Sequence, residues 1–331
     1  MITRSIVATV LIVAVATGCA PGCDARLFDA CEKARDLARF AATELAESAP
    51  SGNLVVGESD AHHATGLVSI AVRAGSASHS VPLLSGVTLR GDSVAASTAF
   101  GTANRRDASF SVEFSAGGLR GVRVKGTRVG AIDVLGSASV LPSFDGGGLR
   151  TSSHAIGFGL GMRVGVVGET RFLPAVSVSI MGRATPVYAM KSDPLPIDGG
   201  GTATIALESV QAHGYVGRIA ASKKFGPLGI TAGFGKDDYR TAAAYRVTGS
   251  EPGMDTGNLA FNGPRSRRDV AFGGVTLALG RATLAAEAGR VSASRDLHVT
   301  NTFVGGGLTK PRTFVTVGVR IPAGRTRDRV R

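Results

Sequence analysis

The sequence has no tryptophan, few other aromatic residues and no cysteine after position 31. With 5% aromatic residues and four tyrosines, it has little material for the aromatic girdles that flank the lipid-facing band of many membrane proteins. No run after the N-terminus is apolar over the roughly 18–20 residues that a transmembrane helix needs. A mature chain that spans a membrane must therefore do so with strands, because only helices and closed barrels satisfy every backbone group in lipid.

Glycine is abundant, with 46 of the 331 residues, and much of it stands opposite bulky apolar residues. The clearest example alternates Ile156, Phe158, Leu160, Met162, Val164 and Val166 with Gly157, Gly159, Gly161, Arg163 and Gly165. A membrane barrel turns its bulky side chains to lipid and its small or polar ones to the lumen. A periplasmic or secreted β-sandwich with one wet face is the rival. It accounts for the alternation, but less well for the choice of Gly, Ala and Ser opposite the bulky residues.

We therefore expect an all-β fold, a transmembrane antiparallel β-barrel of about 12–14 strands with a short N-terminal helix. Short turns at Gly226-Pro227 and Gly280-Arg281 join long alternating segments, as periplasmic turns of barrels do. Longer polar stretches are expected to form the outer loops, at residues 186–201, 248–268 and 294–310. The expected organisation is a signal peptide at 1–19, a helical plug or lid segment at 20–60, the barrel at 61–322 and a basic disordered tail at 323–331.

The N-terminus reads as an export signal, with Arg4 ahead of an apolar core that ends in small residues. Ala16-Thr17-Gly18-Cys19 resembles a loose bacterial lipobox, which makes Cys19 a candidate for lipidation. Cys23 and Cys31 then remain as a pair, and an oxidising periplasm would allow a disulfide between them. The alternative is two free thiols. Neither reading provides a metal site, since no further Cys or suitably placed His completes a ligand set.

Residues 25–47 form the one clear helical pattern, with apolar residues at three- and four-residue steps. Asp24 is a suitable N-cap, and Pro50, Ser51 and Gly52 end the pattern. The apolar stripe is narrow and rich in alanine, which fits a helix in a tight space. A plug or hatch in the barrel is one interpretation, and a simple lid or spacer is the other.

The formal charge of +12 comes mostly from scattered arginines. They follow no nucleic-acid motif, so we expect outer-membrane lipid and a small solute as partners and no nucleic acid. Charges within strands avoid lipid, because an Arg at the bilayer midplane costs about 2–4 kcal/mol. We therefore expect these side chains to line the lumen or the rim: Arg73, Glu113, Asp133, Arg163 and Arg218. Glu287 and Arg290 differ in parity, so at least one of them should lie at a strand end.

No catalytic, metal or cofactor site is expected. The chain lacks an HExxH run, a CxxC pair and a Walker loop, and it has no G-x-S-x-G nucleophile elbow. The adjacent residues His62 and His63 point apart on a strand and are best interpreted as solvated. His213 with Glu208, Asp237 and Asp238 would form an acid–base group if their loops converged. Ion pairing at the rim is the simpler interpretation, so we expect no enzyme, although a barrel hydrolase is the open alternative.

The order of export signal, N-terminal helix and Gly-rich alternating strands resembles Gram-negative outer-membrane β-barrel proteins. Within that group, a helical segment ahead of some 14 strands is similar to the long-chain fatty acid transporter family, although no residue-level motif matches. The resemblance implies a lumen plugged by the N-terminal segment and passage of a small solute, hydrophobic solutes included. The alternatives are a structural or adhesive surface barrel without transport and a secreted β-sandwich binding protein.

Overall fold

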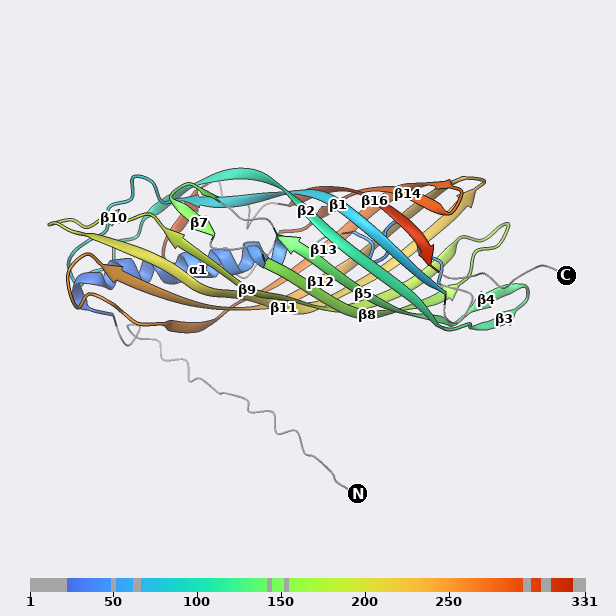
Figure 1. Ribbon diagram of the computed structural model, residues 1–331, viewed down its shortest axis with the longest axis horizontal. Helices are drawn as coiled ribbons and strands as arrows, with labels where there is room; N and C mark the ends of the chain where they lie inside the picture. The colour runs from blue at the N-terminus through green and yellow to red at the C-terminus, as the bar shows by residue number, and fades with distance from the viewer. Residues whose placement is uncertain are drawn as a thin grey trace, which may run out of the picture.

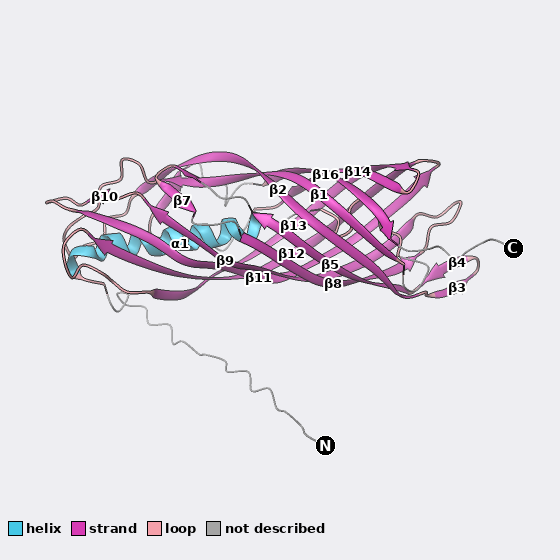
Figure 2. Ribbon diagram, in the orientation of Figure 1, coloured by secondary structure: helices cyan, strands magenta, loops and turns pink. Residues whose placement is uncertain are grey.

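A computed structural model describes residues 23–48, 52–61, 67–141, 145–151, 155–293, 299–304 and 311–323. The molecule is an elongated barrel of tilted strands with a helix in one half (Figures 1 and 2). The expected signal peptide, the lipidation candidate Cys19 and the basic tail beyond Ala323 lie outside the described residues. So do His62 and His63.

Ten antiparallel strands close the ring, because the first of them pairs with the last. The predicted closed antiparallel barrel is thus confirmed. In ring order the strands are β1 (Val68–Leu83), β2 (Ala99–Leu119), β5 (Ala131–Leu141), β8 (Ala155–Val167), β9 (Ala175–Ser192), β11 (Thr202–Phe225), β12 (Leu228–Gly249), β13 (Leu259–Leu279), β14 (Ala282–Val291) and β16 (Arg312–Ala323).

The ring has fewer strands than the 12–14 expected. The remaining strands of the described chain are short and lie in the connections: β3 (Val122–Val124), β4 (Thr127–Val129), β6 (Asp145–Gly146), β7 (Leu149–Thr151), β10 (Leu195–Pro196) and β15 (Thr302–Val304). Gly130, with a φ of +75°, separates β4 from β5. Strands β9 and β13 extend into stretches that we had expected to be loops.

The two ends of the barrel differ. At the right of Figure 1, two-residue turns join β11 to β12 and β13 to β14, and β1 begins and β16 ends there. We call this the short-turn end. At the opposite end lie the longer connections, including those from β1 to β2, from β9 to β11 and from β12 to β13. We call this the long-loop end.

The strands place bulky apolar side chains on the outside of the ring. On β8, Phe158 is 59% and Leu160 is 67% exposed, whereas Arg163 on the opposite face is buried. Alternation of the same kind runs through the neighbouring strands, with exposed outward side chains at Ile70, Val72, Phe110, Val112, Phe114, Val178, Ile180, Ile219, Ile230, Phe234, Val275, Val315, Val317 and Val319. The outside is therefore an apolar belt around the barrel, and the inside carries small and polar residues.

The N-terminal helix lies inside the long-loop half of the ring. A 3₁₀ turn, η1 (Ala25–Leu27), leads into α1 (Phe28–Ser48). Asp24 caps η1 by accepting a hydrogen bond from the Arg26 backbone N–H at 2.9 Å. Cys23 and Cys31 form a disulfide, which ties the chain ahead of the helix to its first turns. Arg26 contacts Glu251 between β12 and β13 at 2.7 Å, so the helix starts at the long-loop end.

Candidate functional site: the filled lumen

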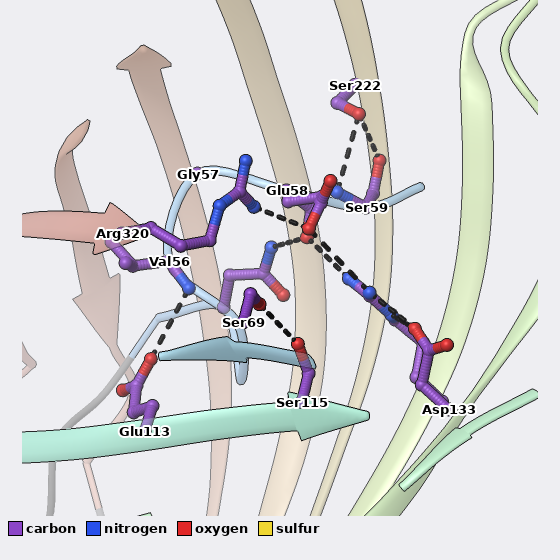
Figure 3. A network of polar contacts seen from close by, with 12 residues as sticks. Val56, Gly57, Glu58, Ser59, Ser69, Glu113, Ser115, Asp133, Ser222 and Arg320 are labelled. Carbon is purple, nitrogen blue, oxygen red and sulfur yellow. Dashed lines mark hydrogen bonds and ion pairs between the residues drawn. The ribbon is translucent and has the colours of Figure 1, made fainter. Parts of the chain in front are cut away.

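Residues 52–61, which we call the lumen segment, follow the helix and lie in the half of the barrel next to the short-turn end. Their polar contacts come from β1, β2, β8, β11, β14 and β16. These strands are distributed around the whole ring, so a chain that touches all of them must lie inside it. Figure 3 shows the segment with the inward side chains that surround it.

Arg73 of β1 and Glu113 of β2 form the first group. Arg73 Nε lies 3.1 Å from Glu113 Oε1, and its Nη2 donates to the Asn53 carbonyl at 2.7 Å. Glu113 Oε2 in turn accepts from the Val56 backbone N–H at 3.4 Å. The ion pair of the wall therefore also binds the backbone of the lumen segment on either side of residue 54.

Asp133 of β5 and Arg163 of β8 form the second group. Arg163 binds Asp133 Oδ2 through Nε at 3.0 Å and Nη2 at 2.5 Å, and its Nη1 donates to the Glu58 carbonyl at 3.3 Å. The Glu58 carboxylate meets Arg320 of β16 at 2.5 Å. Glu58 thus lies between cations from two separate parts of the wall (Figure 3).

Arg218 of β11, Asp237 of β12 and Arg268 of β13 form the third group. The two oxygens of Asp237 accept from Arg218 at 2.5 Å and from Arg268 at 2.9 Å. Arg218 also donates to the Gly52 carbonyl at 2.8 Å. A carboxylate that accepts from two guanidiniums, one on each neighbouring strand, is stabilised by charge-assisted hydrogen bonds. One of these cations, Arg218, also binds the start of the lumen segment.

Glu287 of β14 and Ser222 of β11 complete the contacts. Glu287 accepts from the backbone N–H groups of Asn53 at 3.3 Å and Gly57 at 3.0 Å. Ser59 and Ser222 share a hydrogen bond of 2.6 Å between hydroxyl oxygens. Gly57 has a φ of +67°, and a Cβ there would meet the Thr276 side chain at 2.4 Å. Only glycine fits this turn without displacing the wall.

The helix fills the other half of the lumen, mainly with apolar side chains. Its buried face belongs to the largest apolar cluster of the described residues: Leu27, Ala30, Cys31, Ala34, Leu37, Ala38, Ala42 and Leu45 pack with side chains of β11, β12 and the long-loop connections. Phe40 stacks on Phe303 with a centroid distance of 4.4 Å. The helix also has buried polar anchors, including an ion pair between Lys33 and Asp29. Among them, Asp36 accepts from the Thr300 and Asn301 backbones at 2.8 Å, and Glu44 binds Arg312 at 2.9 Å.

Among the described residues, the inward charges are shielded from solvent. Arg73, Arg163 and Arg218 are each at most 2% exposed, whereas side chains that line an aqueous pore contact water. Glu113 and Asp133 are buried as well. A cavity of about 20 Å³ remains beside Glu113, Arg183 and Tyr239, which is room for one water molecule.

All five charges expected in the lumen or at the rim lie inside the ring. Arg73, Glu113, Arg163 and Arg218 also share one binding partner, the lumen segment. The parity difference between two residues of β14 also appears: Glu287 is buried, and Arg290 is exposed beside the strand end at Val291. Sequence reasoning missed the contributions of Glu58, Arg268 and Arg320. The alternation along the strands indicated an inward position for Arg268 and Arg320. No sequence pattern indicated that Glu58 contributes to the site.

The acid–base cluster considered around His213 is not assembled. His213 and Glu208 are exposed on the outer face of β11, and Asp237 and Asp238 point to opposite faces of β12, because neighbouring strand residues do so. Asp238 binds Arg265 and Arg267 outside the barrel. Within the described part of the chain, no group of three or more His, Cys, Asp or Glu residues could hold a metal ion. No described helix is long and apolar enough to cross a membrane.

No protein-family model matches the chain, and no curated protein matches it. Among solved structures, it is similar to the translocator domain of the autotransporter NalP from Neisseria meningitidis, with 13% identity over 90% of this chain and 99% of that one and a TM-score of 0.40. The outer membrane protease OmpT from Escherichia coli has 8% identity, coverage of 78% and 97%, and a TM-score of 0.43. The toluene transporter TbuX from Ralstonia pickettii has 9% identity, coverage of 79% and 90%, and a TM-score of 0.32. At these scores the matches assign no function.

Proposed function

We propose that the protein is an outer-membrane β-barrel that passes a small solute, hydrophobic solutes included, when the lumen segment moves aside. The membrane placement is supported by the apolar belt, since exposed rings such as Phe158 and Phe234, 59% and 60% exposed, belong in lipid rather than water. By the usual barrel arrangement, the short-turn end faces the periplasm.

The observation that carries the gating proposal is the convergence of charges from six strands on one ten-residue segment. The helix α1 also buries charges, at Asp29, Lys33 and Asp36, but the rest of its buried face is mainly apolar. Buried ion pairs contribute little net stability over apolar packing of the same volume. Their presence around a single segment therefore fits a closed state that is specific and can be exchanged for another set of partners.

A disulfide that locks the segment tests this proposal. Ser59 lies on the lumen segment and Ser222 on the wall, with hydroxyl oxygens 2.6 Å apart. Ser59→Cys with Ser222→Cys should cross-link with little displacement, because a disulfide needs a sulfur separation of about 2.05 Å. The matched control is Ser69→Cys with Ser115→Cys, whose oxygens lie 2.7 Å apart on the neighbouring wall strands β1 and β2 (Figure 3).

Proteoliposomes carry both measurements, swelling with arabinose as the hydrophilic probe and uptake of a fluorescent fatty acid as the hydrophobic probe. We expect oxidised Ser59→Cys/Ser222→Cys to lose about tenfold or more of the wild-type flux of at least one probe, and reductant to restore it. The control pair should behave as wild type in both states, although reductant also opens the native disulfide. If the oxidised Ser59→Cys/Ser222→Cys variant passed both probes at the rate of the wild-type protein, the proposal would be contradicted.

A structural or surface barrel without transport is the second candidate. It is favoured by the burial of the inward charges and by the two-part filling of the lumen. The same experiment separates the two functions, because a structural barrel gives no flux of either probe in wild type, lock or control, whether oxidised or reduced.

A further inference from the structure

The outer face carries a second concentration of charge, on β12, β13 and β14 next to the apolar belt. The outward side chains there are Lys236, Asp238, Arg240, Arg265, Arg267, Asp269 and Arg290. β12 runs from the short-turn end to the long-loop end, so its charges lie beyond Phe234 towards the long-loop end. The positive charges outnumber the negative ones by three in this group, which we call the outer basic patch.

The carboxylates of the patch leave two of its cations unmatched. Asp238 is shared by Arg265 at 2.6 Å and Arg267 at 3.3 Å. Arg240 faces Arg265 directly across β12 and β13, and like charges in that position are destabilising. Neither Arg240 nor Arg290 has a hydrogen bond or ion pair with another described side chain.

The remaining pair is open to other partners. Lys236 Nζ lies 3.7 Å from Asp269, with side chains 85% and 72% exposed. An exposed pair of this kind contributes roughly 0–1 kcal/mol, so Lys236 can turn to an anion at little cost. The patch therefore provides several cations without strong partners and favours a ligand of at least one negative charge.

An apolar groove of about 800 Å³ adjoins these cations. Its apolar lining includes Ile180, Ile219 and Phe234 of the belt, and Lys236 and Arg290 stand at its edge. A second depression of about 510 Å³ shares Lys236, Asp269 and Ser292 with the groove. Its other charged lining residues are Asp237, Asp238, Arg267 and Arg268. The surface thus offers an apolar groove and a charged depression side by side.

We propose that the outer basic patch binds the phosphate of an outer-leaflet lipid whose acyl chain lies in the groove. Guanidinium groups match phosphate oxygens in geometry and charge, and the groove would shield one chain against Ile219 and Phe234. The charge excess and the position at the border of the belt select a phosphorylated lipid over an apolar solute or a peptide. This proposal rests on the membrane placement but not on solute passage.

The test compares two lipids and two variants by native mass spectrometry in detergent. Diphosphoryl lipid A is the probe, and monophosphoryl lipid A, with the same acyl chains and one phosphate fewer, is its matched ligand control. Lys236→Gln with Arg290→Gln removes two charges from the patch. Arg123→Gln with Lys125→Gln removes two exposed charges from the β3–β4 hairpin at the short-turn end.

We expect the patch variant to bind diphosphoryl lipid A about tenfold or more weakly than wild type, and the hairpin variant to bind as wild type does. Wild type should prefer the diphosphoryl lipid. Equal binding by the patch variant, equal binding of both lipids by wild type, or a protein dimer that the patch variant abolishes would each overturn the proposal. All substituted side chains are exposed, and heat-modifiable migration confirms folding. Binding is scored whether or not any probe crosses the barrel, so the two proposals fail separately.

Discussion

The two halves of the lumen are filled by different chemistry. The long-loop half holds α1, whose buried face packs mainly leucine, alanine and phenylalanine against the wall, with Asp29, Lys33 and Asp36 as buried charges among them. The other half holds the lumen segment, which is bound by Arg73, Arg163, Arg218 and other inward charges. Both fillers come from one stretch of chain ahead of β1, so their difference reflects the wall that each one meets.

The comparison teaches which half can change. Apolar packing is non-directional and scales with buried area, so sliding the helix exposes surface without offering new contacts. A buried charged group instead needs an oppositely charged partner, because a buried ion without one is strongly destabilising. The charged half therefore has a sharply defined closed state that can be exchanged only for another fully paired one.

The largest expected effect comes from removing the carboxylate that two arginines share. Asp237→Ala leaves Arg218 and Arg268 facing each other in a buried site, and breaking a buried pair costs about 3–5 kcal/mol. Thermal shifts of the heat-modifiable band in detergent would measure the loss. Asp238→Ala is the adjacent control, since its partners lie on the outer face and exposed pairs contribute roughly 0–1 kcal/mol. Equal shifts in the two variants would contradict the inward pairing.

A cavity in the apolar half should have a comparable or slightly smaller effect. Leu37 is 1% exposed within the helix cluster, and Leu→Ala in a core costs about 2–5 kcal/mol. Hydrogen exchange distinguishes the halves. We expect the amides of α1 to exchange faster in Leu37→Ala. The amides of the lumen segment should stay protected by their hydrogen bonds to the wall carboxylates. Faster exchange of both segments to the same extent would mean that the two halves act as one unit.

Much of the fold followed from the sequence because one physical rule, alternation between lipid and lumen, acts on every strand. The same rule placed Arg73, Glu113, Asp133, Arg163 and Arg218 inside. The strand count was too high because closure of the ring depends on contacts between distant residues, which no local pattern shows. The binding of the lumen segment could not be predicted, since it is set by which backbone groups the turns at Gly52 and Gly57 direct to the wall.

The native disulfide should contribute less than either side chain above. Cys23 and Cys31 are eight positions apart, and constraining so short a loop in the unfolded chain contributes roughly 2.5 kcal/mol in the chain-entropy model. Cys23→Ser with Cys31→Ser should lower the free energy of unfolding by about that amount. This loss should appear as a lower thermal midpoint, with the wall charges still in place. An unchanged midpoint in detergent would show that α1 packing alone holds the start of the helix.

The smallest expected effect concerns the cap of the helix at the long-loop end. The Arg26 backbone N–H donates to Asp24, which holds the pKa of this carboxyl below its usual range. A lowered pKa in the folded state means that the cap stabilises the chain above the ordinary Asp range and loses this contribution as the pH falls through the lowered value. Asp24→Ala should therefore speed exchange at the Arg26 amide near neutral pH relative to wild type, and the two proteins should converge in acid. A difference that persists in strong acid would place the effect in packing around Arg26 and Glu251 instead of in the carboxylate.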